Sequence, residues 1–312
     1  MNYETLYNNI QAYAENTEAL FVASIPVFVQ QAEERIYNSV QIPALRRNVT
    51  GTMTLGNQYI SLPDDWLSNY SLAVIDSAGT YTYLLNKDVN FIREAYPSNG
   101  VAARGLPRYY ALFGSQYSNT NEMALITGPT PDQNYNVEMH YFYYPPTIVQ
   151  GQITELDTAG FNPGAAYTNG LYQNVPLTSG SGSGATADIF VAGGIVTTVT
   201  IKFGGQFYKV GDTLSADANN IGGSGSGFTI DVTAVSNSTG TSWLGDNYDP
   251  VLFYGAMREA MLFMKGEQDL IGYYEQKYAE ALQQLQRLGD GLERGDAYRD
   301  GQTKINVSGA RS

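Results

Sequence analysis

The stretch that decides the fold runs from Asp249 to Leu288 and reads DPVLFYGAMREAMLFMKGEQDLIGYYEQKYAEALQQLQRL. Its first half predicts a helix with Asp249 as N-cap and Pro250 at the first helical position, where a missing backbone N–H costs nothing. The apolar residues that follow leave this helix almost no polar face, which is typical of a helix surrounded by protein. We therefore expect a buried central helix.

A second helix is predicted after the polar break at Gly266. Its apolar seam recurs at alternating helical spacings and consists of Tyr274, Tyr278, Ala281, Leu285 and Leu288. The other positions are polar, so the helix needs one apolar partner and keeps one face for water or another subunit. Gly289 is expected to end it. The residues predicted to form a subunit contact or a lumen wall are Gln276, Glu280, Gln283 and Arg287.

Two amphipathic helices near the N-terminus offer the apolar partner. The first is predicted from about Tyr3 to Ala14, and the second begins with Ser24 as a cap and Pro26 in its first turn. Pro43 is expected to stop the second helix. Its polar face is expected to carry Gln30, Gln31, Glu33, Glu34 and Arg35. We predict that the N- and C-terminal helices form one bundle.

From Thr50 the hydrophobic pattern changes to an alternation of period two, which indicates strands. Thr52 to Leu55 and Gln58 to Leu62 predict a hairpin across Gly56-Asn57. A short helix is expected from Asp88 to Ala95. Further strands are predicted at 72–75, 81–85, 108–113, 123–127 and 135–144, the first two forming a second hairpin. Together they predict an antiparallel β-domain.

A third region, 151–241, is rich in Gly, Ser, Thr and Val and contains a repeat. GSGSGATADI at 180–189 matches GSGSGFTIDV at 223–232, and a tyrosine with an apolar lead-in precedes each copy, Tyr172 and Tyr208. Two copies fall short of the three or more that a solenoid needs, so we expect a compact barrel or sandwich.

The predicted fold class is therefore α+β: a helical bundle formed by the N- and C-terminal helices, an antiparallel β-domain between them, and an inserted small all-β domain. The domain prediction assigns 1–150 and 242–290 to the core and 151–241 to the insert. The charged, glycine-containing segment 291–312 is predicted to be an extended tail that only a partner orders.

Composition restricts the function. The chain of 312 residues has no cysteine, one histidine and a net charge of −13, which excludes disulfides and thiolate chemistry and disfavours binding to nucleic-acid phosphates. No apolar run is long enough to cross a bilayer, and no signal peptide is evident, so we expect a soluble protein without an export address. The 25 tyrosines either provide protein contacts or only complete strands.

No motif predicts catalysis, a cofactor or a metal site, and we expect no enzyme. The GSGSG copies lack the lysine and helix of a phosphate loop. Asp64-Asp65 reads more simply as a cap than as an acid–base pair, and His140 has no catalytic partners nearby in sequence. Four loop residues do not fit the regular calcium spacing, namely Asp212, Asp217, Asn219 and Asn220.

A series of segments nevertheless resembles a known family. The segments are SIPVFVQQAEERI, IPALR, GTMTL, ISLPDDWL, FIREAYP, GLPRYYALFG, PTPDQNYNVEMHYFYYPP, LFYGAMREAMLFMKGEQDLIGYYEQKYAEAL and GDAYRDG. In order and spacing this series resembles the head-to-tail adaptor proteins of short-tailed bacteriophages, over about 1–146 and 242–301. The insert departs from the family pattern and is similar to glycine-rich β-modules of virion proteins.

The resemblance implies a virion structural protein at the neck between head and tail, assembled in the host cytoplasm. It implies a ring, usually twelve-fold, that docks under the portal protein and contacts tail nozzle or tail-fibre proteins, while double-stranded DNA passes through without sequence-specific binding. It also implies a portal-docking tail, in which we expect Arg294, Tyr298, Arg299, Lys304 and Ile305 to take part. The alternative is a tail-associated recognition protein whose insert binds a host surface glycan.

Overall fold

The computed structural model describes the backbone of residues 1–115 and 123–309, and the side chains of residues 1–114 and 123–289. The predicted α+β class is confirmed. The chain forms two compact units, which we describe one at a time: Met1–Val40 with Pro146–Gly295, and Gln41–Pro145 with Asp296–Ser312. This division groups the inserted sheet with the helices, whereas the β-domain forms a unit of its own.

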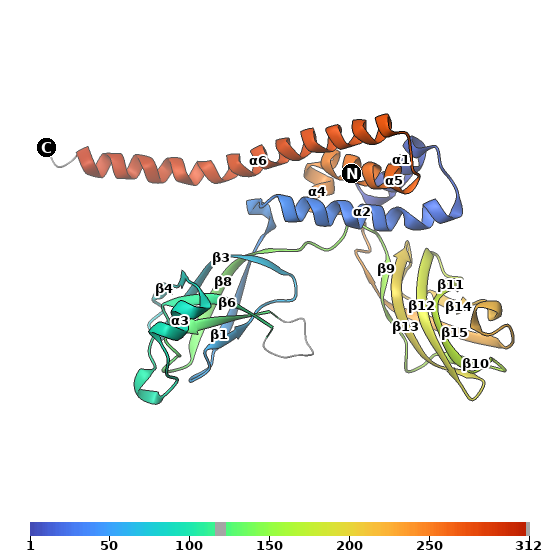
Figure 1. The fold of residues 1–312 in the computed structure, drawn as a ribbon, viewed down its shortest axis with the longest axis horizontal. Coiled ribbons are helices and arrows are strands. Elements are labelled where there is room, and N and C mark those ends of the chain that lie inside the picture. Colours follow the sequence, from blue (N-terminus) through green and yellow to red (C-terminus); the bar gives the residue numbers. More distant parts are fainter. Residues whose placement is uncertain (116–122, 310–312) are drawn as a thin grey trace. The chain divides into compact units, whose positions relative to one another are not determined.

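The helices of the first unit are α1 (Tyr3–Ala14), α2 (Ala19–Ser39), α4 (Trp243–Asn247), α5 (Asp249–Phe263) and the part of α6 (Gln268–Gly309) up to Gly295 (Figure 1). Helix α5 packs against both α1 and α2. In α6, Tyr278 lies beside Gly255 of α5, and Nε2 of Gln286 donates to the carbonyl of Ser39 at the end of α2 at 3.4 Å. The buried face of α6 consists of Tyr274, Tyr278, Ala281 and Leu285, as predicted, whereas Leu288 is exposed.

Two predictions about α2 are wrong. The helix begins at Ala19, so Pro26 lies inside it and Ser24 does not cap it. The Ser24 hydroxyl instead donates to the carbonyl of Leu20 one turn earlier, at 2.8 Å. Glu33, which was expected on the polar face, is buried. Both differences arise from tertiary contacts. Gln206 donates to the carbonyl of Val22 that the proline leaves unpaired, and Thr147 and Ile148 donate to the carboxylate of Glu33.

The C-terminal helices also differ from expectation. Tyr248, and not Asp249, occupies the N-cap position of α5. The last turn of α5 is not surrounded by protein, because Leu262 and Phe263 are 44% and 43% exposed. Gly289 does not end α6: the helix continues to Gly309, so the segment predicted as an extended tail is helical over most of its length. The helix also contains Gly291, Gly295 and Gly301, although each glycine weakens a helix by about 1 kcal/mol relative to alanine.

The second unit contains two four-stranded sheets with the orders β1-β8-β3-β4 and β2-β7-β6-β5. Their strands are β1 (Arg46–Met53), β2 (Tyr59–Ser61), β3 (Trp66–Ile75), β4 (Tyr81–Tyr83), β5 (Leu85–Asn86), β6 (Tyr109–Ser115), β7 (Met123–Gly128) and β8 (Tyr135–Tyr143). The short helix α3 (Val89–Ala95) packs against β6 and β7. The region was expected to be a single antiparallel sheet; one strand pair, β5 with β6, is parallel.

The hairpin predicted across Gly56-Asn57 does not form. β1 pairs with β8, and β2 pairs with β7 in the other sheet. Met53 and Leu62, one from each of the two expected strands, are both buried in the core of the second unit. Burial of these side chains from two different sheets therefore outweighs the local turn signal. The second predicted hairpin is confirmed, with Ala73 opposite Tyr83 and Ile75 opposite Tyr81.

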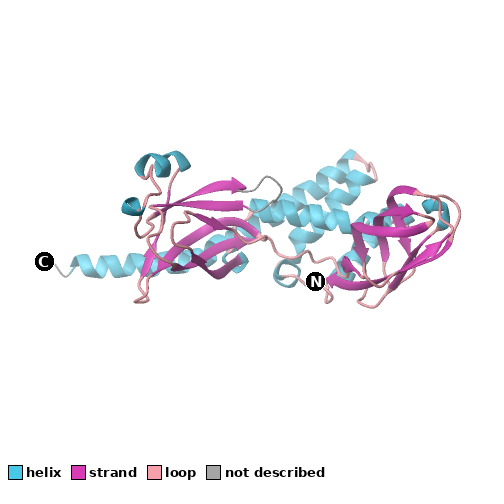
Figure 2. Cartoon of the chain, turned by 90° about the horizontal axis from the view of Figure 1, so that it is seen from below, coloured by secondary structure: helices cyan, strands magenta, loops and turns pink. Residues whose placement is uncertain are grey.

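The insert folds into a seven-stranded sheet of its own, nearly closed like a barrel (Figure 2). The strands are β9 (Gln152–Leu156), β10 (Asn162–Ala165), β11 (Gly170–Thr178), β12 (Ser183–Ala192), β13 (Ile195–Gln206), β14 (Thr213–Ala216) and β15 (Ser226–Ser236). β12 and β15 begin at the same position of the two GSGSG copies, as a duplication requires.

The structure corrects how the two repeats align. The residue equivalent to Tyr208 is Tyr167, and not Tyr172, because both lie in the pattern GxxYxxG, GAAYTNG at 164–170 and GQFYKVG at 205–211. The repeats interlock: a Cβ on Gly182 would overlap the ring of Tyr208, and one on Gly225 would overlap the ring of Tyr167. Each position therefore requires glycine, because the ring of a tyrosine from the other repeat fills the space that a side chain would take.

Candidate functional site

The insert is joined to the helices at the proline inside α2. Pro26 has no N–H, so the carbonyl of Val22, one turn earlier, lacks its helical hydrogen bond. Nε2 of Gln206, at the end of β13, donates to that carbonyl at 3.4 Å. The hydroxyl of Tyr3 in α1 donates to Oε1 of the same glutamine at 2.5 Å. Gln206 is fully buried, and its amide thus ties α1, α2 and the insert together.

Phe207 adds an aromatic contact to this joint. Its ring centroid lies 5.3 Å from that of Tyr3 and 5.3 Å from that of Tyr7, the latter in an edge-to-face arrangement. The backbone of Phe207 has φ +62°, a left-handed conformation that costs a non-glycine residue roughly 1 kcal/mol or more. Contacts with both tyrosines hold the residue in this conformation.

A buried carboxylate fixes the chain where it enters the insert. Glu33 of α2 accepts hydrogen bonds from the hydroxyl of Thr147 at 2.6 Å and from the backbone N–H of Ile148 at 2.8 Å. Burial raises the pKa of Glu33 to about 7, because desolvation disfavours the charged form more than these two hydrogen bonds favour it. The group therefore titrates near neutral pH.

The chain leaving the insert is fixed to the chain entering it. Nδ2 of Asn237 donates to the carbonyls of Thr147 at 2.8 Å and Thr241 at 2.9 Å. The N–H of Tyr3 donates to the carbonyl of Gly240 at 2.7 Å. Both boundaries of the insert are thereby hydrogen-bonded to each other and to α1, so the insert is docked on the bundle and not merely tethered to it.

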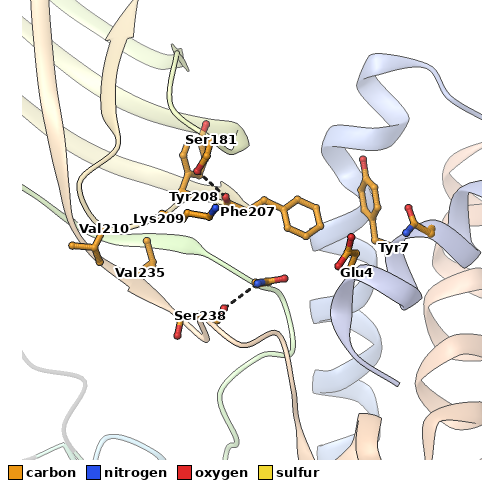
Figure 3. A pocket seen from close by; sticks show the side chains of 11 residues that line it. Glu4, Tyr7, Ser181, Phe207, Tyr208, Lys209, Val210, Val235 and Ser238 are labelled. Carbon is orange, nitrogen blue, oxygen red and sulfur yellow. Dashed lines mark hydrogen bonds between the residues drawn. The ribbon is translucent and has the colours of Figure 1, made fainter.

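A cavity of about 650 Å³ lies beside this joint, between α1 and the insert (Figure 3). Figure 3 shows Phe207 directed towards Tyr7, with Glu4 on the helix side and Lys209 on the insert side. The lining residues are Glu4, Tyr7, Asn8, Gln150, Ser181, Phe207, Tyr208, Lys209, Val210, Val235 and Ser238. This mixture of amides, hydroxyls, aromatic rings and two opposite charges can hold a short polar segment.

The four residues predicted on the wet face of α6 do share one exposed face. Gln276, Glu280, Gln283 and Arg287 are all exposed. Nε2 of Gln276 donates to Glu280 at 3.1 Å, and Nζ of Lys277 donates to the other carboxylate oxygen at 3.0 Å. These hydrogen bonds lower the pKa of Glu280, the bond from Lys277 having the largest effect. The face is a row of charged and amide groups available to another protein.

The residues predicted for portal docking are Arg294, Tyr298, Arg299, Lys304 and Ile305. They fall in the C-terminal part of α6, where only the backbone is described. Their side chains lie outside the described residues, so their part in docking stays a prediction.

The acidic pair and the histidine have structural contacts. Asp65 forms an ion pair with Arg47 and accepts a hydrogen bond from the hydroxyl of Tyr141 at 2.8 Å, whereas Asp64 is exposed. His140 lies 3.0 Å from a carboxylate oxygen of Glu138 on the same face of β8. Glu138 also accepts from Tyr81 at 3.0 Å, which is the main reason that its pKa is lowered.

The loop carboxylates organise backbone turns. Asp212 accepts from the hydroxyl and N–H of Ser181 and from the N–H of Lys209, and Asp217 accepts from the N–H of Asn219 at the start of a short 3-10 helix (Ala218–Ile221). Up to Gly289 and outside 116–122, no group of three or more acidic or histidine side chains is placed to hold a metal ion. In the same part of the chain, no helix is long and apolar enough to span a membrane.

Sequence reasoning missed both buried polar groups of the joint. Glu33 carried a signal, because it follows Val29 at i+4 and precedes Ile36 at i+3 on the apolar face of α2. Gln206 carried no local signal, since its partners lie at the other end of the chain. The pattern GxxYxxG, repeated at 164–170 and 205–211, could have given the correct repeat alignment.

The fold and the joint define an α+β protein in which an inserted sheet is held on a helical bundle by buried polar contacts. The family model for the SU10 adaptor protein matches residues 1–174, more than half of the chain. The chain therefore belongs to the SU10 adaptor protein family. This membership makes it a phage adaptor, which is a structural protein of the virion and not a class of enzyme. No curated protein matches the chain.

Proposed function

We propose that this chain forms an oligomeric ring that joins the portal to the tail of a short-tailed phage and lets DNA pass. The observation that carries the proposal is the family match over residues 1–174. That span includes both N-terminal helices and the whole β-domain of the second unit. The ring is expected to sit at the neck between head and tail after assembly in the host cytoplasm.

Charge supports the passage of DNA. The chain carries 30 acidic and 17 basic residues, a net charge of −13. A ring of such subunits has a surface that repels the phosphates of a passing duplex, so DNA can move through without being held. No sequence-specific binding is expected.

The exposed polar face of α6 supports contact between proteins. Its amide and charged side chains lie opposite the buried seam that packs on the bundle, so substitutions there leave the core intact. We assign this face to a subunit contact or to the lumen wall. We assign the C-terminal part of α6 to portal docking. Residues 291–312 contain four basic and three acidic residues, whereas the chain as a whole has an excess of acidic residues.

The test is assembly with the portal. The full-length protein is mixed with the portal protein of the same phage, and the products are examined by native mass measurement and electron microscopy. The proposal predicts a closed ring, twelve-fold by family resemblance, bound to the portal. A protein that stays monomeric and ignores the portal contradicts it. The glycan-binding alternative predicts instead a specific hit for the full-length protein on a glycan array.

A further inference from the structure

The sheet β1-β8-β3-β4 has two open edges. At one edge, β1 pairs with β8 through eight consecutive residues without a bulge, and within the described residues it pairs with no other strand. Six consecutive residues of β1, 47–52, are exposed. Soluble proteins usually protect a long edge strand with charged side chains, proline or a bulge. β1 has no proline and no bulge, and its charged residues, Arg46 and Arg47, are confined to its first two positions. Such an edge is suited to pairing with another strand.

The opposite edge is β4, which pairs only with β3 among the described residues. Here Tyr81 and Tyr83 are 49% and 63% exposed, and Leu85 in the following strand is 60% exposed. Tyr81 and Tyr83 are two residues apart in β4, so they project to the same face of the sheet. Exposed tyrosines of this kind are enriched where proteins contact proteins.

Strand direction allows the two edges to meet. Each neighbouring pair in this sheet is antiparallel, so β1 and β4 at opposite edges run in opposite directions. When a second copy is placed head to tail, its β4 therefore lies antiparallel to β1 and continues the alternation. A contact between two different edges is heterologous, which is the type of contact that closes a ring.

Charge does not oppose this arrangement. β1 begins with Arg46 and Arg47 and contains no acid, and β4 (Tyr81–Tyr83) carries no charged residue. Arg47 is ion-paired with Asp65 of its own chain, and the guanidinium of Arg46 lies over the ring of Tyr70. Two copies of a strongly acidic chain repel each other in general, whereas these two edges bring no like charges together.

We propose that β1 of one subunit pairs with β4 of the next, so that the sheets of neighbouring subunits join edge to edge around the ring. The proposal rests on the proposed ring and names its interface. The partner is a second copy of this chain, and the strand pair is one part of an interface to which α6 also contributes.

Cysteine cross-linking tests this pairing, because the chain has no cysteine of its own. Thr50→Cys and Tyr83→Cys are made as separate single variants, since both positions lie on the face of the sheet that carries Glu138. The variants are mixed in equal amounts under ring-forming conditions and oxidised. Asn48→Cys and Thr52→Cys repeat the measurement to allow for register. The matched control replaces the partner cysteine by Leu171→Cys, an equally exposed position on the insert.

The proposal predicts a disulfide-linked dimer in at least one mixture of a β1 variant with Tyr83→Cys, at a yield roughly tenfold above the control, because a disulfide needs Cα atoms about 4–7 Å apart. A link within one chain is excluded by the sheet, since three strand spacings of about 4.8 Å each separate β1 from β4. If wild type forms rings on the portal but no mixture cross-links, or if β1 variants link only to themselves, this interface is wrong. If wild type forms no ring, the proposed function itself is wrong.

Discussion

Replacing Gln206 by leucine tests the joint between the insert and the helices. The change keeps the side-chain volume close to that of glutamine but removes the partner of the buried hydroxyl of Tyr3 and of the partly buried carbonyl of Val22. Each such loss costs about 1–3 kcal/mol, so we expect the free energy of unfolding of the first unit to fall by roughly 2–5 kcal/mol. Urea unfolding measures it, followed by the fluorescence of Trp243 in a Trp66→Phe background, which leaves one tryptophan.

The specific part of this prediction is coupling with Pro26. In a Pro26→Ala variant the backbone N–H of α2 is restored and can donate to Val22 itself, so that carbonyl no longer needs Gln206. Gln206→Leu should therefore cost about 1–3 kcal/mol less in the Pro26→Ala background than in wild type. Tyr3→Phe is the matched control, because it removes only the other hydrogen bond and should add to Pro26→Ala without coupling. Additivity of Gln206→Leu and Pro26→Ala, within about 0.5 kcal/mol, would refute the reasoning.

Four further variants probe the core and the proposed contact face. The raised pKa of Glu33 means that the folded state holds a proton that the unfolded state releases near pH 4.5, so the stability from this group is full below that pH and is lost as pH rises through about 7. Glu33→Gln should remove this pH dependence, which amounts to a change on the order of 3 kcal/mol in the free energy of unfolding. If the melting temperatures of wild type and variant change in parallel between pH 5 and pH 8, this prediction is contradicted. Leu285→Asp places a charge in the fully buried seam and should lower the melting temperature by more than about 10 °C; an unchanged melting temperature would overturn the helical-core interpretation. Glu280→Ala and Arg287→Ala, on the exposed face, should shift the concentration needed for assembly while leaving the melting temperature unchanged, and a loss of stability in either would place them in the core instead.

The helices could be predicted because their signals are local. The periodicity of α1 and the seam of α6 reflect a face buried against the bundle, and a face of that kind is visible in the order of residues alone. The prediction that Gly289 ends the second C-terminal helix rested on one local signal and was wrong. The helix runs through Gly289, Gly291, Gly295 and Gly301, so a glycine in this segment does not act as a stop signal.

The strand pairing and the joint could not be predicted because their partners are far away in sequence. Gly56-Asn57 is a good turn signal, but β1 and β2 pair in different sheets with partners between 63 residues (Ser61 to Ala124) and 96 residues (Arg46 to Phe142) away. Pro26 likewise read as a helix start because its missing N–H is tolerated there at no cost. The group that makes it tolerable inside α2 is Gln206, 180 residues later. A single sequence gives no indication of such a pair.

The measurement that tests the central claim most directly is electron microscopy of the full-length protein bound to its portal, with the mass of the complex determined in parallel. The proposed adaptor function predicts a closed ring of this chain seated on the portal with an open lumen. It also predicts that the residues beyond Leu288 are the ones nearest the portal. A protein that remains monomeric at high concentration with the portal present, or a ring whose lumen is closed to a DNA duplex, would contradict it.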